Sequence, residues 1–587
     1  MFLQRNNKHL AAFSRSLLKN KNRKLNNKLV LSKRTLLTST KKQQQQQQNN
    51  FKFKTASITT GIAALLILTS YYNSSNITNE PSKKGLRTIS LDEFKKHSSP
   101  DDCWVIINGI IYDLTNFIAK HPGGPEIIKA NSGKDVSALF NPIHASDLID
   151  KYIMKKDIKG IIDPNCDFPK ELITKALSPG ETPESMALKE KLRQNLPSID
   201  ELKTIFDFEY ICSKILPKNA WYYYSSGSED EFSLRENHNA YHRVQFRPRV
   251  LVNVKDVDTS CTILGEKHEV PFYVSATALA ALGYEGGEVS IAEGCAQGSF
   301  KIPQMISTLS SKTLTEISEA KDKFGGQDQW FQLYVNTDRS KALDLIKEAE
   351  AKKCKAIFIT VDAPSLGRRE KDVKLKAKPS RENGISKGLS TFIDPSLDWE
   401  DVKYLKKQTS LPVFLKGIQR KEDALTAVEN GFNIVISNHG GRQLDHTVSP
   451  LETLTEVVPL LKEKGYKPGE NVEVFIDGGV RRGTDILKAI ALGATGVGLG
   501  RPILYSNSAY GAKGVEKCKD MLREEIAMNM RLLGVNKLSE LNESFVDTQG
   551  LKYRSVRLSN DYLNEEVYEP RNIVEWDMAL EGGDDDS

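Results

Sequence analysis

The stretch of sequence that decides the fold is Glu473-Val474-Phe475-Ile476-Asp477-Gly478-Gly479-Val480-Arg481-Arg482-Gly483. It begins with a short apolar run that predicts a buried strand, and this run ends abruptly at an acidic residue and two glycines. The next apolar run, residues 496–499, ends in a similar way at Gly500-Arg501-Pro502. Helix-sized segments follow both turns, and this alternation is typical of an α/β fold with a parallel sheet.

Working outward, six more β-rich runs precede these two, again separated by helix-sized segments. The eight runs cover residues 270–275, 304–308, 330–335, 356–361, 412–416, 433–437, 473–476 and 496–499. Eight such strands predict an α/β (β/α)8 TIM barrel, which we assign to residues 201–560. The gap between the fourth and fifth strands is the longest, and residues 374–394 within it predict a mobile loop over one end of the barrel.

Polar side chains gather where these strands end. Barrel enzymes place their chemistry at the C-terminal ends of the strands. The alternative, polar groups buried in a barrel mouth without a function, is energetically unfavourable. The polar residues at these ends are Ser307, Gln332, Tyr334, Thr360, Asp362, Lys416, His439, Arg442, Asp477 and Arg501. The glycine turns after the last two strands, with Arg481 and Arg501, predict a phosphate site.

The charge of the chain is unevenly distributed. Residues 1–79 contain 14 of the 82 Lys and Arg residues and no Asp or Glu. The remainder therefore has 68 basic and 76 acidic residues, a net charge of −8, which argues against a nucleic-acid-binding protein. An acidic surface favours a basic partner instead. The seven cysteines show no CxxC pair, so neither a zinc site nor a disulfide framework is expected.

The basic N-terminal segment is typical of a mitochondrial presequence. An apolar stretch follows at residues 58–72, and its uninterrupted part, 61–68, is too short to span a bilayer comfortably. We interpret residues 1–80 as a two-part sorting signal for the mitochondrial intermembrane space. A single weak membrane anchor that stays attached is the alternative.

Residues 85–162 predict a small α+β domain. A helix start at Ser90-Leu91-Asp92-Glu93 precedes two short strands, 103–107 and 110–112, which the turn Asn108-Gly109 joins into a hairpin. The motif His121-Pro122-Gly123-Gly124 follows, and His144 comes 23 residues after His121. Two such imidazoles on opposite sides would fill both axial positions of a haem iron, although either histidine alone is more simply a core or surface residue.

This segment resembles the cytochrome b5 family, on the His-Pro-Gly-Gly motif, the run Gly133-Lys134-Asp135-Val136-Ser137-Ala138-Leu139-Phe140 and the second histidine. The resemblance implies haem b held by His121 and His144. Residues 163–200 carry five prolines and a weak helical pattern at 185–194, and they predict a linker between the two domains. A linker that is mobile and one that packs on the surface fit this pattern equally.

The barrel resembles the FMN-dependent L-2-hydroxy acid oxidising family. The motifs that carry the resemblance are Ser437-Asn438-His439-Gly440-Gly441-Arg442-Gln443-Leu444-Asp445, Tyr222-Tyr223-Tyr224-Ser225-Ser226-Gly227, Gln332-Leu333-Tyr334, Thr360-Val361-Asp362-Ala363-Pro364 and Asp477-Gly478-Gly479. The resemblance implies that His439 is the general base and that Asp362 stabilises its charged form. It also implies that Arg442 and Tyr223 bind the substrate carboxylate, Tyr334 binds the substrate hydroxyl, Lys416 lies beside the flavin and Arg369 is a second cation.

The same resemblance implies a set of FMN contacts. These are Ser275, Ala276, Thr277, Ala278, Ser307, Gln332, Thr360, Lys416, Asp477, Gly478, Gly479, Val480, Arg481, Gly500 and Arg501. A small Ala278 and an aliphatic Leu309 favour a short substrate side chain such as the methyl group of lactate. One methylene is worth only about 1–3 kcal/mol of discrimination, so close homologues of lactate remain possible substrates.

Together the two resemblances imply an L-lactate dehydrogenase that passes electrons singly from FMN through haem b to cytochrome c, as a homotetramer. The first alternative is an oxidase that uses oxygen, but the presence of both His121 and His144 counts against it. The second is an electron carrier whose barrel is inactive, but the expected catalytic residues are all present. His238 and His242, four residues apart, are interpreted as structural or surface residues, and residues 561–587 as an acidic tail.

Overall fold

The structure is a computed structural model, and it describes residues 85–121, 125–164, 166–174, 181–374 and 393–553. The predicted sorting signal, most of the loop at 374–394 and the acidic tail lie outside these residues. Across the described ranges, no helix is both long and apolar enough to cross a membrane.

The small α+β domain is built around the predicted hairpin. Strands β3 (Asp102–Ile107) and β4 (Ile110–Asp113) pair antiparallel, with Ile107 opposite Ile110. Asn108 and Gly109 both take positive φ, +53° and +80°, as a two-residue turn of this kind requires. Both strands are rich in β-branched residues with buried side chains. They lie inside a five-stranded sheet whose strand order is β1-β5-β4-β3-β2.

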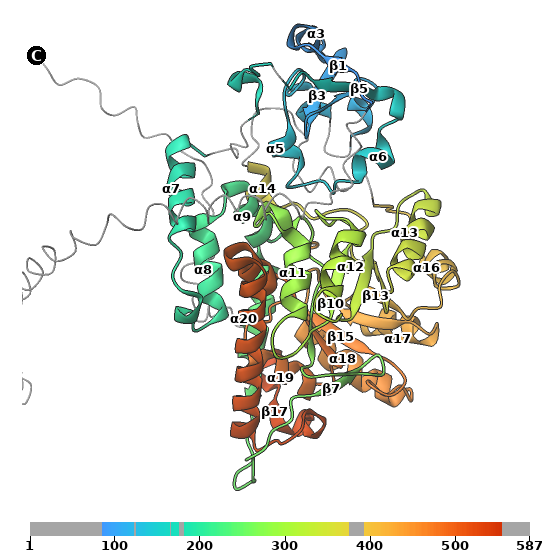
Figure 1. Cartoon of the computed structure of the whole chain (residues 1–587). Helices are drawn as coiled ribbons and strands as arrows, with labels where there is room; N and C mark the ends of the chain where they lie inside the picture. Colours follow the sequence, from blue (N-terminus) through green and yellow to red (C-terminus); the bar gives the residue numbers. More distant parts are fainter. Residues whose placement is uncertain (1–84, 122–124, 165, 175–180, 375–392, 554–587) are drawn as a thin grey trace, which may run out of the picture. The chain divides into compact units, whose positions relative to one another are not determined.

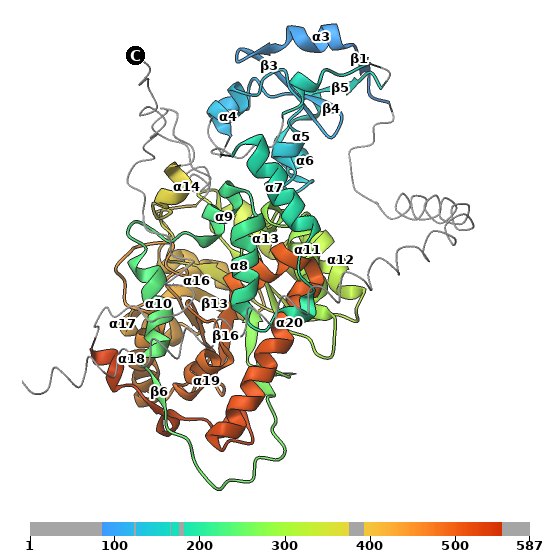
Figure 2. The same cartoon turned by 90° about the vertical axis from the view of Figure 1, so that its left-hand side faces the viewer.

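Short helices complete this domain (Figure 2). Ser90 accepts a hydrogen bond from the Glu93 N–H and so starts α3 (Leu91–Lys96), as predicted. The other elements are β1 (Thr88–Ile89), β2 (Ser98–Ser99), η1 (Ile118–Lys120), α4 (Pro125–Lys129), α5 (Ser137–Phe140), α6 (Leu148–Tyr152), η2 (Lys155–Asp157) and β5 (Ile158–Ile162).

The segment predicted as a linker is more ordered than its sequence suggests. Its first part, with η3 (Lys170–Leu172), joins the small domain, because the Asp135 N–H donates to Leu172 O and the Thr174 N–H donates to Asp135 O. Its second part contains α7 (Pro183–Gln194), the predicted weak helix. Here Lys189 forms an ion pair with the buried Glu181 and donates to Leu216 O, which ties α7 to the barrel domain.

The eight predicted strands form the closed parallel barrel that the sequence indicates (Figure 1). They are β9 (Phe272–Val274), β10 (Gln304–Ser307), β11 (Gln329–Leu333), β12 (Ile357–Thr360), β13 (Val413–Ile418), β14 (Asn433–Ile436), β15 (Val474–Asp477) and β16 (Gly496–Leu499). Strand β16 pairs with β9 and closes the ring. The predicted fold class is confirmed.

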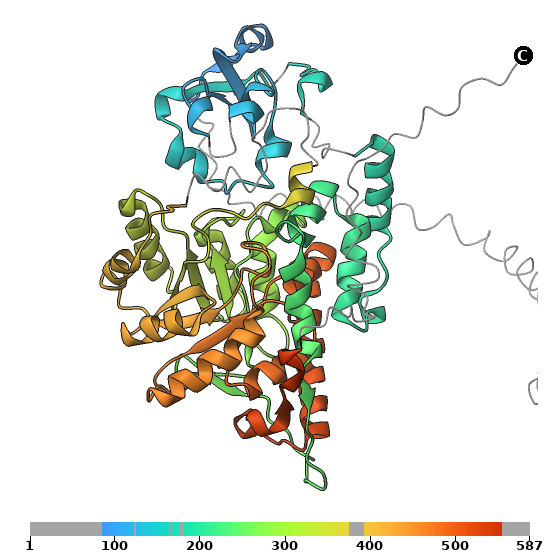
Figure 3. The same cartoon turned by 180° about the vertical axis from the view of Figure 1, so that it is seen from behind.

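Helices surround the barrel, as the view from behind shows (Figure 3). They are α11 (Gly287–Ala296), α12 (Leu314–Asp322), α13 (Arg339–Ala351), α14 (Glu370–Lys374), α16 (Trp399–Lys406), α17 (Lys421–Glu429), α18 (Pro450–Glu463), α19 (Gly483–Ala491) and α20 (Arg501–Leu533). Before the first barrel strand come α8 (Ile205–Ile215), α9 (Lys218–Ser225) and α10 (Phe232–His242), and α8 packs along α20. Short strands β6 (Gln245–Phe246), β7 (Cys261–Ile263), β8 (Glu266–His268) and β17 (Val546–Asp547) complete the domain. So do the short 3-10 helices η4 (Ile199–Glu201), η5 (Ala280–Leu282), η6 (Leu538–Glu540), η7 (Glu543–Phe545) and η8 (Gln549–Lys552).

Large aromatic side chains fill the inside of the barrel. Phe358 stacks on Phe414 with ring centres 4.2 Å apart, and Phe475, Trp330 and Tyr273 pack against this pair or each other. All five side chains are almost completely buried. The barrel interior is therefore a packed core, and the site for chemistry is left at the mouth formed by the C-terminal ends of the strands.

Candidate active site

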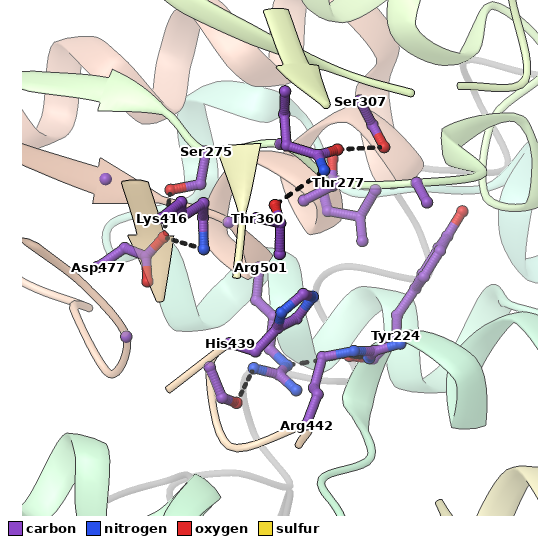
Figure 4. Close-up of a pocket in the computed structure, with 18 of the residues that line it drawn as sticks. Tyr224, Ser275, Thr277, Ser307, Thr360, Lys416, His439, Arg442, Asp477 and Arg501 are labelled. Atoms are coloured by element: carbon purple, nitrogen blue, oxygen red, sulfur yellow. Dashed lines mark hydrogen bonds and ion pairs between the residues drawn. The ribbon is translucent and has the colours of Figure 1, made fainter. Parts of the chain in front are cut away.

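One pocket opens at the C-terminal ends of the barrel strands (Figure 4). Counting its open mouth, which includes open solvent, it encloses about 1060 Å³ of space between the side chains. It is lined by all the predicted catalytic and FMN-contact residues except Asp362, together with Leu309, Tyr224, Leu366, Gly440, Gly498, Pro502 and Leu504. Asp362 contacts the pocket through His439.

Hydrogen bonds link the polar side chains around the barrel mouth. Gln332 Nε2 donates to Thr360 Oγ1 at 2.9 Å, and Ser307 Oγ donates to Gln332 Oε1 at 3.3 Å. On the other side Lys416 Nζ lies 3.1 Å from Asp477 Oδ2, which also accepts from Ser275 Oγ. Ser307, Gln332 and Thr360 come from three adjacent strands, whereas the contacts of Asp477 with Lys416 and Ser275 each reach across one intervening strand. Barrel closure thereby arranges donors and acceptors suited to the edge of a flat heterocycle.

His439 and Asp362 form a partly buried pair, in which the carboxylate is the more deeply buried group. The Nδ1–H of His439 donates to Asp362 Oδ1 at 3.0 Å, and the Tyr334 hydroxyl donates to Nε2 at 3.2 Å. With Nδ1 committed to the carboxylate, Nε2 carries the lone pair that can take a proton from a substrate. Asp362 Oδ2 has no hydrogen-bond partner within the described part of the chain, so His439 alone orients this carboxylate through its side chain.

A glycine on the intervening strand makes the pair possible. Asp362 follows β12 and His439 follows β14, so the carboxylate must cross over β13. At the crossing point Gly417 takes φ +114° where the register of β13 shifts, and a Cβ there would lie 2.5 Å from Asp362 Cβ. Only glycine suits both this conformation and this spacing. The sequence analysis did not identify Gly417, although a glycine directly after a strand lysine could have suggested a bulge.

The protonation states suit a base next to an anion. Burial lowers the pKa of His439 below its ordinary value, although Asp362 acts in the opposite direction, so the imidazole is neutral at neutral pH. Burial acts to raise the pKa of Asp362, but His439 and Lys416 outweigh it and keep the carboxylate ionised. Burial likewise opposes the charge on Lys416, yet Asp477 and Asp362 raise the pKa of this lysine above its usual value.

The turn that carries His439 is strained and well supported. His439 itself takes φ +60°, followed by Gly440 and Gly441 at +65° and +75°. A non-glycine residue in this conformation costs about 1–3 kcal/mol, so the surroundings must hold it. Asn438 does so through a reciprocal pair of amide hydrogen bonds with Asn237, 2.6 and 2.7 Å long, and it also accepts from the Gly441 N–H.

Two arginines share the C-terminal end of α9. Arg442 Nη1 donates to Tyr223 O at 2.6 Å, and Arg501 donates to Tyr224 O and Ser226 O. Cations are favoured at a helix C-terminus because the last carbonyl groups lack partners there. The Tyr223 ring also lies 4.9 Å below the Arg442 guanidinium and 5.7 Å from that of Arg369. Helix α9 therefore positions the cationic side of the pocket.

The charges in the pocket fit anionic ligands. Five basic residues line it, Arg369, Lys416, Arg442, Arg481 and Arg501, against one carboxylate, Asp477. Arg369 is 3% exposed, and its Nε has no hydrogen-bond partner within the ranges that the structure describes. A site with this excess of buried positive charge is completed by a phosphate and a carboxylate, so the residues present fit the phosphate of FMN and an acid substrate.

The predicted phosphate turns differ in their accessibility. At the start of α19, Asp485 already accepts from the Arg481 and Arg482 N–H groups, and Glu209 pairs with Arg481. The start of α20 is more open, because a Cβ on Gly500 would meet nothing closer than 3.8 Å. Sequence analysis did not identify the two carboxylates, Glu209 and Asp485, because both come from elements whose packing it could not predict.

The small domain brings its two histidine rings close together, with their planes tilted by 42°. The ring centres of His121 and His144 are 6.1 Å apart. Two metal–nitrogen bonds of about 2 Å, with the distance from each nitrogen to its ring centre added, come to about 6 Å, so one iron fits between the rings. The Nδ1 of His144 lies 3.2 Å from Phe140 O, and burial, then His121, lower the pKa of His144 to about 4. Its neutral Nε2 is therefore available as a ligand.

Of the two histidines interpreted as structural or surface residues, His238 is buried and His242 is exposed. The His238 ring is buried and contacts Gly479 O at 2.9 Å. Within the residues that the structure describes, no group of three or more His, Cys, Asp or Glu side chains could hold a metal ion.

Comparison with known proteins agrees with this geometry. A family profile described as FMN-dependent dehydrogenase matches residues 212–548, and one described as cytochrome b5-like Heme/Steroid binding domain matches residues 90–163. The chain belongs to the FMN-dependent dehydrogenase family. Its cofactors are FMN and haem, and this member of the family carries a cytochrome b5-like domain ahead of its barrel.

Relatives in the FMN-dependent dehydrogenase family cover most of the chain. It is 51% identical to an L-lactate dehydrogenase (cytochrome) of Saccharomyces cerevisiae, over 88% of this chain and 90% of that protein. The corresponding Wickerhamomyces anomalus protein is 47% identical over 83% of this chain and 84% of its own length. A glycolate oxidase of Spinacia oleracea is 38% identical and matches 61% of this chain and 99% of its own length.

Solved structures resemble more than half of the chain. A flavocytochrome b2 mutant with pyruvate bound matches 68% of this chain and 99% of its own, with 54% identity and a TM-score of 0.61. A mandelate oxidase mutant with (S)-mandelic acid matches 59% of this chain and 98% of its own, with 35% identity and a TM-score of 0.52.

Proposed function

We propose that this chain oxidises L-lactate to pyruvate and delivers the electrons through haem b to cytochrome c. The observation that carries the proposal is the partly buried His439–Asp362 pair, which lies beside two arginines in a pocket for an anionic cofactor. The two facing imidazoles of the small domain supply the second cofactor site. When bound, FMN accepts two electrons from the substrate, and haem carries them one at a time.

His439 is the base of the reaction. Its neutral Nε2 takes a proton from the 2-hydroxy acid, and Asp362 stabilises the imidazolium that forms. Burial keeps the Tyr334 hydroxyl protonated because it raises the pKa of the phenol, so Tyr334 can donate a hydrogen bond to the substrate oxygen. Lys416 stays charged and would stabilise the negative charge that develops on FMN when the cofactor is bound and reduced.

Arg442 and Tyr223 bind the substrate carboxylate. One nitrogen of Arg442 is committed to Tyr223 O, which fixes the guanidinium plane and leaves its other donors for the substrate. Arg369 is the second cation on the same side. Ala278 and Leu309 border the pocket and restrict the substrate side chain to a short apolar group.

Cytochrome c is the proposed final acceptor because the chain beyond residue 79 is acidic and would attract a basic partner. We place the protein in the mitochondrial intermembrane space, with residues 1–80 as its sorting signal, 85–162 as the haem domain, 163–200 as the linker, 201–560 as the dehydrogenase barrel and 561–587 as the tail. The proposed assembly is a homotetramer, and two exposed leucines support contact with a second copy.

Leu251 is fully exposed and Leu532, at the end of α20, is 68% exposed. Hydrogen bonds from Arg249 to Leu533 O and Gly534 O bring their two segments together, and a second copy would bury these side chains.

The test is an anaerobic reduction of the purified holoenzyme by L-lactate, with flavin and haem absorbance followed separately. Flavin reduction followed by haem reduction, and then by reduction of added cytochrome c, is the expected result. Reduced flavin with haem left oxidised would favour an oxidase. Reduction by a longer 2-hydroxy acid but not by L-lactate would contradict the proposed substrate.

A further inference from the structure

The residue after Arg442 connects two loops of the active site. Gln443 is 4% exposed and follows β14 in the same turn as His439. Its Nε2 donates to Asp362 O at 2.9 Å and to Ser365 O at 2.8 Å, and its Oε1 accepts from the Gly367 N–H at 3.1 Å. All three partners belong to the loop after β12, so a single amide side chain joins the loops that carry Asp362 and His439.

The loop that Gln443 holds begins and ends at functional side chains. Asp362 at its start pairs with His439, and Arg369 at its end reaches the cationic side of the pocket. The contact is tight, because a Cβ on Gly367 would lie 2.5 Å from Arg442 O and 2.8 Å from Gln443 O. At the far end, the Glu229 N–H donates to Arg368 O. Near Asp362, two sets of hydrogen bonds join the loop after β12 to the turn that carries His439. One set is made by Gln443, and the other is the Asp362–His439 contact.

We propose that Gln443 is a positioning residue for proton abstraction, which holds the Asp362 backbone so that its carboxylate meets His439. This inference rests on the proposed oxidation of a 2-hydroxy acid. Arg442 is positioned independently, because its backbone partners lie on α9 rather than on the loop after β12. Loss of Gln443 therefore impairs the base and leaves the binding of the carboxylate intact.

Two substitutions separate this role from simple packing. Gln443→Met keeps the length and volume of the side chain but removes all three hydrogen bonds. Gln443→Glu keeps an acceptor for the Gly367 N–H and places a carboxylate against two carbonyl oxygens. Leu444→Ala is the matched control, because Leu444 is adjacent in sequence and 74% exposed.

The measurements are flavin content, the rate of flavin reduction by L-lactate and the affinity for oxalate as a substrate-like dicarboxylate. We expect both Gln443 variants to retain flavin, to reduce it about 10- to 100-fold more slowly and to bind oxalate within threefold of the unsubstituted enzyme, with Leu444→Ala unchanged. A reduction rate within threefold, a parallel loss of oxalate affinity, or loss of flavin from both variants would each overturn the proposal. The unsubstituted enzyme is measured first, and its failure to reduce flavin would contradict the proposed function instead.

The pH profile provides a readout that packing alone would not move. The charged and titratable groups facing His439 are Asp362, Lys416, Arg369 and Tyr334, and among them Asp362 is the one that raises its pKa. A displaced Asp362 lowers the pKa of His439, so the acid limb of kcat/KM moves to lower pH in Gln443→Met. An acid limb that stays in place, at a reduced rate, would assign Gln443 a structural role only.

Discussion

Asp362 lies over Gly417 of the neighbouring strand to reach His439, and the atoms Oδ1 and Nδ1 of the pair are 3.0 Å apart. Strand β13 lies between β12 and β14, and a side chain at position 417 of β13 would occupy the space that Asp362 uses. The bulge at Gly417, with φ +114°, removes that obstacle. The base and its carboxylate are therefore neighbours because an intermediate strand has no side chain at one position.

Replacement of His439 by glutamine should abolish most of the activity. His439→Gln keeps a polar side chain of similar size but cannot accept a proton, and general-base catalysis is worth about 10²- to 10⁴-fold. The rate of flavin reduction by L-lactate in a stopped-flow experiment measures this loss. His446→Gln is the control, because its side chain is 59% exposed and does not line the pocket. A loss below tenfold would assign the base elsewhere.

The reaction should persist into mildly acidic solution. Activity requires neutral His439, and burial lowers the pKa of this histidine, so the acid limb of kcat/KM is expected below pH 6.5, the ordinary value for histidine. Asp362→Asn removes the group that raises this pKa, so the limb moves to still lower pH. The maximal rate falls about 100-fold because the imidazolium loses its stabilising charge. A limb that moves upward in Asp362→Asn would contradict this assignment.

Gly417→Ala tests the passage of Asp362 over β13 without replacing Asp362 or His439. The added methyl group would meet Asp362 Cβ at 2.5 Å and is disfavoured at φ +114°. We expect flavin reduction to slow about tenfold or more, with a downward shift of the acid limb like that of Asp362→Asn. Gly465→Ala is the control for positive φ alone, because it also has positive φ, +87°, but a Cβ there meets nothing within 4 Å. An equal effect of both substitutions would point to backbone strain rather than to Asp362.

Arg442→Lys keeps the positive charge at this position, but it should still weaken the binding of the substrate carboxylate strongly. A lysine cannot keep one donor on Tyr223 O while it presents two more to a carboxylate. We expect kcat/KM for L-lactate to fall about 100-fold, corresponding to about 2.7 kcal/mol. Arg368→Lys, on an exposed neighbour outside the pocket, is the matched control. Unchanged steady-state kinetics in Arg442→Lys would exclude a bidentate contact.

Replacement of a histidine in the small domain should impair electron transfer to cytochrome c but leave the oxidation of L-lactate by flavin intact. His144→Ala removes one of the two facing imidazoles, so the haem spectrum should be lost or changed to that of a five-coordinate iron. Flavin reduction by L-lactate should stay within twofold, whereas reduction of cytochrome c should fall at least 100-fold. Reduction of cytochrome c at the original rate would show that electrons bypass the haem.

Local patterns in the sequence were enough for the elements and for most of the site. The eight strands, the Asn108-Gly109 hairpin and the helix start at Ser90 follow from apolar runs and turn residues that act over a few positions. The pocket residues could be predicted because the end of each strand is visible in the sequence, and a closed barrel brings all such ends to one mouth.

Other features depended on contacts between distant segments, which only barrel closure and register decide. The passage of Asp362 over Gly417, the three hydrogen bonds of Gln443 and the pairing of Arg481 with Glu209 join residues 55 to 272 positions apart. The linker shows the same limit, because Glu181 is buried only once its segment packs on the barrel. Sequence by itself determined which groups are present and on which elements, and tertiary packing decided which of them touch, because such contacts depend on geometry that no local pattern encodes.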